Sequence, residues 1–299
     1  MRHGFYAFLV FAAGASYGVL STFVKLAYGE GFTVGDVSGG PCFLGVLLLW
    51  VLALAKGVPR PGGKAVLFLA ASGCLMAGTT MFYYQALTTL SASLAVVFLF
   101  QSIWIGTVLD AVLKRECPSP WRLFSIIMAL GGTILASGML AEEDFRFSSG
   151  MIWGFLAACS YALFITVNTI RIEGITPIAK SAFMTSADMI AVFLILPPLF
   201  LTDTAYFLDF LPWASFLSLF GVVLPPILLS WGMPHIGPGL GSLLTAAELP
   251  TALLLSSLVL GEPVGPLQWA GVALILGGIA AGNGAEMKKR KEKASGEGT

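Results

Sequence analysis

The sequence predicts an all-α integral membrane protein with ten transmembrane helices, arranged as two inverted five-helix repeats. Three observations lead to this prediction. Apolar residues make up 57% of the 299 residues and charged residues 11%, whereas soluble domains hold about 45–50% and about 25%. Ten apolar runs are each long enough to cross a bilayer. Short motifs recur at a near-constant spacing of 144 to 146 residues.

The composition also excludes several classes of protein. The mean hydropathy is +0.88, and a surface this poor in charge would not keep a soluble protein of this length in solution. We therefore expect neither a soluble enzyme nor a disordered chain, and no nucleic-acid partner. Four dispersed cysteines and two histidines offer no cluster of metal ligands. The chain carries no nucleotide-binding motif, so we expect no metal, no cofactor and no nucleotide partner.

The ten predicted helices follow one another with short connections, which leaves no room for a soluble domain. The first run is too long for the apolar core of a signal peptide, and the later runs are equally apolar. The expected helices cover residues 5–28, 37–55, 65–87, 91–113, 121–140, 150–170, 181–201, 208–232, 239–260 and 266–284.

Lysine and arginine collect on the cytoplasmic side of membrane proteins, so their positions predict the orientation. With the N-terminus inside, 14 of the 16 Lys and Arg residues fall in inner ends and loops, Arg146 falls outside, and Lys25 lies near the outer end of the first helix. We expect a protein of the cytoplasmic (inner) membrane, surrounded by lipid, with both termini in the cytoplasm. The polar residues 286–299 should form a disordered cytoplasmic tail.

The internal matches predict two repeats. They pair residues 14–18 with 158–162 at an offset of 144, and Glu116 with Glu262 and 131–132 with 277–278 at 146. We therefore expect a first repeat over 1–141 and a second over 142–285. Since each repeat has five helices, an odd number, the second lies upside down. Inverted repeats are typical of secondary transporters, because two near-equivalent halves can exchange conformations and close either face.

Three local patterns carry a family resemblance: Ala15-Ser16-Tyr17-Gly18 with Lys25-Leu26-Ala27, Glu248-Leu249-Pro250 with Gly261-Glu262-Pro263, and Gly277-Gly278. With the length and the 5+5 arrangement, they resemble the EamA-type family of the drug/metabolite transporter superfamily over residues 5–284. The first repeat departs from the family pattern, because Lys114-Arg115-Glu116 replaces a Gly-Glu pair and no proline stands near Gln101. The resemblance implies metabolite or amino-acid transport, often export, by alternating access, and it names no substrate.

We therefore expect a secondary transporter, not an enzyme, that exports a small metabolite, with proton coupling as a hypothesis. Two alternatives stay open. A passive facilitator or channel would share the fold, and nothing in the sequence separates it from a coupled transporter. An integral membrane enzyme would need a nucleophile, base or metal constellation near the interface, and the sequence offers none.

Glu248 is the first candidate for a functional side chain, because ionisable groups within hydrocarbon are costly. It lies near the middle of the expected helix 239–260, and Thr245 shares its face. We interpret this pair as part of a polar stripe facing a cavity. The carboxyl group could carry protons or meet a substrate ammonium group. Alternatively, it is a structural carboxylate bonded to a neighbouring helix near Pro250.

Asp188 and Lys25 are the other charged candidates. Asp188 shares a helical face with Ser181 and Thr185, and it has the same two roles open to it, or pairs with Lys180 near the interface. Lys25 either binds a substrate carboxylate or Glu248, or extends to the outer interface. One central acid and an outer lysine would suit a zwitterion such as an amino acid.

Four uncharged residues complete the candidate site. Gln101 and Asn168 could each bond a substrate or a neighbouring helix. Tyr17 and Tyr161 occupy corresponding repeat positions, where they form either core packing or an aromatic cavity wall.

Other residues are expected to have structural roles. We place Tyr83 and Tyr84 in the aromatic belt at a membrane interface, and read Cys42 as a small buried thiol. Glu262 sits at a helix end and is expected to cap the helix that follows it.

Overall fold

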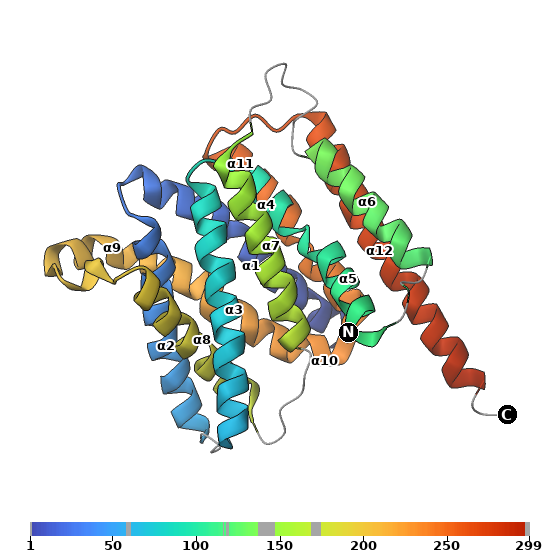
Figure 1. Ribbon diagram of the computed structural model, residues 1–299, viewed down its shortest axis with the longest axis horizontal. Coiled ribbons are helices and arrows are strands. Elements are labelled where there is room, and N and C mark those ends of the chain that lie inside the picture. Colours follow the sequence, from blue (N-terminus) through green and yellow to red (C-terminus); the bar gives the residue numbers. More distant parts are fainter. Residues whose placement is uncertain are drawn as a thin grey trace.

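The computed structural model describes residues 2–57, 61–115, 117, 120–136, 147–168 and 175–296. The regular structure of these residues is helical (Figure 1). The elements are α1 (Arg2–Gly29), α2 (Val34–Lys56), α3 (Gly63–Leu87), α4 (Ala92–Leu99), α5 (Ser102–Lys114), α6 (Pro120–Ala136), α7 (Ser149–Asn168), α8 (Pro177–Ile195), the 3-10 helix η1 (Leu199–Leu201), α9 (Thr204–Leu217), the π-helix η2 (Ser218–Val223), α10 (Leu224–Thr245), α11 (Glu248–Val259) and α12 (Pro266–Gly296).

The apolar segments confirm the predicted membrane fold. Within the described residues, seven helical segments are long and apolar enough to cross a membrane, and three shorter apolar helices cover Leu123–Ala136, Glu248–Val259 and Pro266–Ala281. These ten segments follow the order of the ten predicted helices. The predicted boundary between the repeats, after residue 141, lies outside the described residues.

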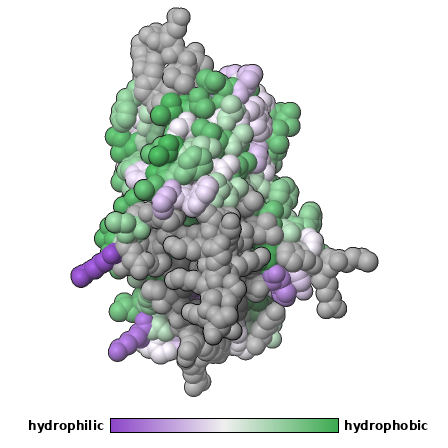
Figure 2. All heavy atoms as spheres, turned by 90° about the vertical axis from the view of Figure 1, so that its right-hand side faces the viewer, coloured by the Kyte–Doolittle hydropathy of each residue, from purple (hydrophilic) through white to green (hydrophobic). Residues whose placement is uncertain are grey.

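A hydrophobic outer surface suits a lipid environment. Large apolar side chains along α6 are exposed, including Trp121, Phe124, Ile127 and Ile134. Figure 2 views the side that carries α6 and α12, and most of the described residues in the upper half of that face are hydrophobic. Burial of such a surface in lipid would remove it from water.

Two of the expected helices are broken at equivalent places in the two repeats. The run expected over 91–113 is divided between α4 and α5, and the run expected over 239–260 is divided between the end of α10 and α11. The second break lies 146 residues after the first, which equals the repeat offset. The backbone changes to i→i−3 bonding at both breaks, from Gln101 N to Phe98 O (3.0 Å) and from Ala247 N to Leu244 O (3.1 Å). Such tighter turns change the direction of the helix axis while the backbone φ and ψ angles stay in the right-handed helical region.

The chain reverses direction within α10, as its contacts with α1 show. Gly221 of η2 faces Leu20 and Gly232 of α10 faces Val10, so η2 and the first part of α10 run antiparallel to α1. Thr245 then lies against Gly14, which is further along α1 than Val10. The eighth and ninth predicted helices are therefore both present, joined inside this element.

Most of the packing is between the repeats. α1 packs against α10 and α11, and the corresponding α7 packs against α3, α4 and α5. α2 packs against α8, and α6 against α12. If each helix is replaced by its counterpart in the other repeat, the same set of pairings results, as an inverted repeat requires.

Both ends of α8 and the end of α12 differ from the sequence expectation. α8 begins earlier than residue 181, because Thr176 caps it and Pro177 suits its first turn, and it ends at Ile195, before Pro197. α12 continues to Gly296, so residues 286–296 are helical where a disordered tail was expected. This stretch contains four Lys, two Glu and one Arg, which have high helix propensity.

Candidate functional site

A cavity of about 410 Å³ lies at the interface of the two repeats. Its walls come from α1, α2, α3 and α4 of the first repeat and from α7, α8, α10, α11 and η2 of the second. This size falls within the range for small-molecule sites. Four of the predicted site residues line it: Glu248, Asp188, Tyr17 and Tyr161.

Glu248 reaches the cavity from the break before α11. It is the first residue of α11, and α1 approaches it closely because Gly18 has no side chain. A Cβ atom at Gly18 would lie 2.8 Å from Cβ of Thr251. Tyr17, Tyr83 and Tyr161 are near enough to interact electrostatically with the Glu248 carboxyl group. The predicted mid-helix acid is therefore placed at a bend and surrounded by phenol groups.

Asp188 lies on α8, on the helical face that was predicted to include Ser181 and Thr185, and all three residues line the cavity. Its side chain is fully buried. The Cys42 thiol donates a hydrogen bond to Oδ2 over 3.3 Å, whereas Oδ1 has no hydrogen-bond partner among the described residues. Gly73 of α3 lets the backbone of α8 approach, since a Cβ there would lie 3.0 Å from Asp188 N.

Three other predicted residues do not belong to the cavity lining. Gln101 is buried at the first helix break, where Nε2 donates to Thr133 Oγ1 (2.6 Å) and Oε1 accepts from Trp104 Nε1 (2.9 Å). Lys25 donates from Nζ to Leu90 O over 2.6 Å. Thr245 donates to Gly241 O one turn back (3.1 Å). The side chain of Asn168, the remaining candidate, lies outside the described part of the chain.

Glu262 caps a helix, but not the one that follows it. Its carboxylate accepts hydrogen bonds from Ala92 N (2.7 Å), Ser93 N (3.3 Å) and Ser93 Oγ (2.7 Å), at the N-terminus of α4. The prediction that Glu262 caps the helix that follows it is therefore wrong, because Glu262 caps α4 instead. The carboxylate joins the end of one repeat to a broken helix of the other.

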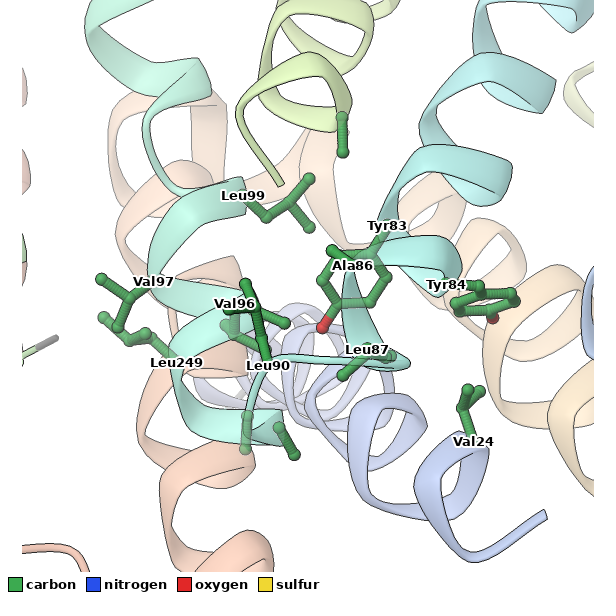
Figure 3. Packing of buried hydrophobic residues seen from close by; sticks show 14 of the residues in the cluster. Val24, Tyr83, Tyr84, Ala86, Leu87, Leu90, Val96, Val97, Leu99 and Leu249 are labelled. Atoms are coloured by element: carbon green, nitrogen blue, oxygen red, sulfur yellow. The ribbon is translucent and has the colours of Figure 1, made fainter. Parts of the chain in front are cut away.

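Sequence reasoning missed several lining residues. Tyr83 and Tyr84, expected in an aromatic belt, are buried on α3 and line the cavity. Figure 3 shows both on α3, with Leu99 beside Tyr83. Cys42 lies 146 residues before Asp188, which equals the repeat offset. The repeat alignment could therefore have paired these two residues.

One end of the cavity is closed by packed side chains. Two of the lining residues, Val37 and Tyr84, also belong to a continuous core with Phe200 and Phe210. We call the rings of Phe32, Phe193, Phe200, Tyr206, Phe207 and Phe210 the aromatic cluster; they contact one another in a chain. At the other end the lining extends to Lys180, in the first turn of α8.

A polar contact holds the closed end together. Tyr206 OH donates to Asp36 Oδ2 over 2.6 Å, and Thr33 donates to the same oxygen from its backbone N (2.7 Å) and its hydroxyl (2.8 Å). Asp36 is buried. This carboxylate therefore ties α9 to the start of α2.

Comparison with known proteins identifies the family to which this chain belongs. The sequence profile of the EamA-like transporter family matches twice, over residues 4–138 and 148–282, and the chain belongs to that family. It is 25% identical over 193 residues to the uncharacterized transporter YwfM of Bacillus subtilis (strain 168), a match that covers 64% of this chain and 63% of that relative's length. A solved crystal structure superimposes with a TM-score of 0.63 at 20% identity, covering 93% of this chain and 96% of the other. The chain is thus a member of a family of membrane transporters.

Proposed function

We propose that the protein is a secondary transporter that moves a small metabolite by alternating access. The observation that carries this proposal is a cavity between interleaved inverted repeats, closed at one end by the aromatic cluster. By the distribution of lysine and arginine, the closed end is extracellular and both termini are cytoplasmic. The structure then corresponds to a state closed toward the outside.

The broken helices support a change between two such states. The bends before Ser102 and Glu248 occupy equivalent places in the repeats, and the second brings a carboxyl group to the cavity. Discontinuous helices with sites near the midplane are typical of transporters built from inverted repeats. If the repeats exchange conformations, the outer end opens while the inner end closes around the same residues.

We propose export as the direction and Glu248 as the group that couples transport to protons. A carboxyl group at the cavity, with tyrosines around it, can bind a proton in one state and release it in the other. A metabolite with an amino group fits a cavity that contains two carboxyl groups. The zwitterion suggested by Lys25 has less support, because Lys25 binds Leu90 O and is not a lining residue.

Transport in proteoliposomes tests the coupling. A thermal-shift screen of a metabolite panel supplies a ligand, and its uptake is then measured with and without an imposed pH gradient. We expect the gradient to accelerate uptake in the wild type and to have no effect in Glu248→Gln. The matched control is Glu30→Gln, the same change at an exposed residue between α1 and α2.

The same liposomes separate a transporter from a channel. A transporter shows counterflow, in which unlabelled substrate inside accelerates entry of labelled substrate, whereas a passive channel does not. Uptake that ignores the pH gradient in the wild type and survives Glu248→Gln would contradict the coupling. Uptake without counterflow would instead favour the facilitator.

A further inference from the structure

We propose that the substrate is an organic amine whose protonated amino group binds Asp188 while its apolar body lies against the aromatic wall of the cavity. This inference rests on the proposed function, because it names the substrate class of the same cavity. It is narrower than a small metabolite: an ammonium group is required, and a carboxylate beside it is not.

The first argument is the incomplete bonding of Asp188. The side chain is fully buried, Oδ2 accepts the weak thiol donor of Cys42, and Oδ1 has no partner among the described residues. Ser38, another buried lining residue, has a hydroxyl oxygen for which the described part of the chain offers no partner. Buried carboxylates are costly unless they are paired and hydrogen-bonded, and nearly all buried polar groups have partners. An ammonium group would supply both the charge and the missing donors.

The second argument is the balance of charge around the cavity. Within the described residues, the charged side chains that line the cavity are Glu248, Asp188 and Lys180, which give two acids and one base. Lys180 precedes Asp188 by eight residues on α8, or about 12 Å along the helix axis, and helical side chains lean toward the N-terminus. Because both side chains lean the same way, the lean does not close the distance between the two charged groups. The adjacent ammonium and carboxylate groups of an α-amino acid do not match this separation.

The third argument is the nature of the walls. Tyr84 lines the cavity together with Asp188, and the lining adds further aromatic and thioether side chains: Tyr83, Tyr161, Phe164, Met76 and Met184. Aromatic faces attract cations, and methionine adapts to apolar groups of varied shape. Such walls suit an amine with an apolar or aromatic body. Glu248, with its own set of tyrosines, remains available for protons.

The proposal is tested by measuring the thermal stability of the purified full-length protein with three probes that share a phenylethyl group. They are 2-phenylethylamine, its neutral isostere 2-phenylethanol, and phenylalanine, which adds a carboxylate next to the amine. Each is titrated against the wild type, Asp188→Asn and the control Asp209→Asn, which makes the same change at an exposed position. We expect the amine alone to raise the melting temperature. Asp188→Asn should weaken its binding by about ten- to hundredfold, as expected for loss of a charge-assisted bond, and Asp209→Asn should not.

A second measurement keeps the test independent of the folding of Asp188→Asn. A hydrophobic carbodiimide labels Asp188 in the wild type, and mass spectrometry follows the modification. The protecting probe is the tertiary amine N,N-dimethyl-2-phenylethylamine, because a primary amine would form an amide with the activated carboxyl group. This amine should protect Asp188 from labelling, and the alcohol should not. The proposal is overturned if the amine fails to stabilise the protein, if the alcohol or phenylalanine stabilises it equally, if Asp188→Asn binds the amine as the wild type does, or if the amine leaves labelling unchanged.

Counterflow separates failure of this inference from failure of the proposed function. An amine that binds at Asp188 but shows no counterflow contradicts the transport proposal and leaves the binding site intact. Counterflow of a metabolite without an amino group, with no binding of the amine, contradicts the substrate class and leaves the transport proposal intact.

Discussion

Single residues of similar chemistry have different roles according to their hydrogen bonds. Gln101 and Asp188 are both buried polar residues of apolar helices. The amide of Gln101 has partners on both its nitrogen and its oxygen, whereas Asp188 has an oxygen with none among the described residues. A buried group whose bonds are complete stabilises the fold. One whose bonds are incomplete is the better candidate for a ligand.

Gln101→Leu should therefore reduce stability and leave the cavity unchanged. The substitution removes the acceptor of Trp104 Nε1 and the donor to Thr133 Oγ1, and an unsatisfied buried group costs about 1–3 kcal/mol. The measurement is the temperature at which half of the protein is still monodisperse after heating, and we expect it to be lower than in the wild type. The ligand affinity should stay within about twofold of the wild type. Thr133→Val, which removes one of these bonds, should have a smaller effect. Normal stability with a large loss of affinity would show that Gln101 contacts the ligand.

The sequence was informative about which residues are unusual and less so about what they touch. Glu248 and Asp188 could be identified because charges in apolar runs are costly, and Tyr17 because of the repeat. Lys25 could not be placed, since its contact with Leu90 O depends on how two helices pack, which the hydropathy pattern does not encode. Tyr83 lies near a helix end in sequence, but its neighbours bury it.

At the scale of elements, α4 depends on another helix for its N-terminus. It has eight residues, too few to be stable alone. Its first backbone N–H groups are bonded by Glu262, which lies just before α12. The predicted apolar run gave the position of this span. The apolar run did not predict the breaks at Gln101 and Ala247. Pro250 accounts for the second break, but no proline lies near the first.

Glu262→Ala should destabilise this connection between the repeats. Three donors of Ala92 and Ser93 would lose their acceptor, at a cost of about 1–3 kcal/mol. We expect a lower melting temperature and faster hydrogen exchange at the start of α4, measured by mass spectrometry. Glu30→Ala, at an exposed position, is the control. Unchanged exchange at α4 would mean that the cap contributes little.

At the scale of the whole molecule, the two ends of the cavity differ in packing although the repeats are equivalent in sequence order. The end that we propose to be extracellular holds the aromatic cluster and the buried Asp36, whereas at the other end the cavity lining reaches Lys180 at the start of α8. Alternating access requires these two arrangements to be of similar free energy, so that substrate and protons can shift the balance. A single strong contact at one end can then determine which state is populated.

The hydrogen bond from Tyr206 to Asp36 is the contact that we expect to favour the outward-closed state. It is 2.6 Å long, its acceptor is a buried carboxylate, and a hydrogen bond to a charged group contributes about 1.5–3 kcal/mol. Tyr206→Phe removes it and keeps the ring in the aromatic cluster, so the outward-open population should rise about tenfold or more. Cys42, which is buried beside the cavity, reports this opening when Cys74, Cys117 and Cys159 are replaced by alanine.

The measurement is the rate at which a membrane-impermeant thiol reagent, added from outside to cells or oriented vesicles, modifies Cys42. Tyr206→Phe should accelerate the modification, because opening the aromatic cluster exposes the α2 face that carries the thiol. Tyr6→Phe makes the same change on α1, next to His235 of α10 and away from this cluster, and should leave the rate unchanged. A rate that rises only with reagent on the cytoplasmic side would reverse the assignment of the closed end. A rate unaffected from either side would mean that the cluster, and not its hydrogen bond to Asp36, keeps the outer end closed, since apolar packing would then outweigh the lost bond.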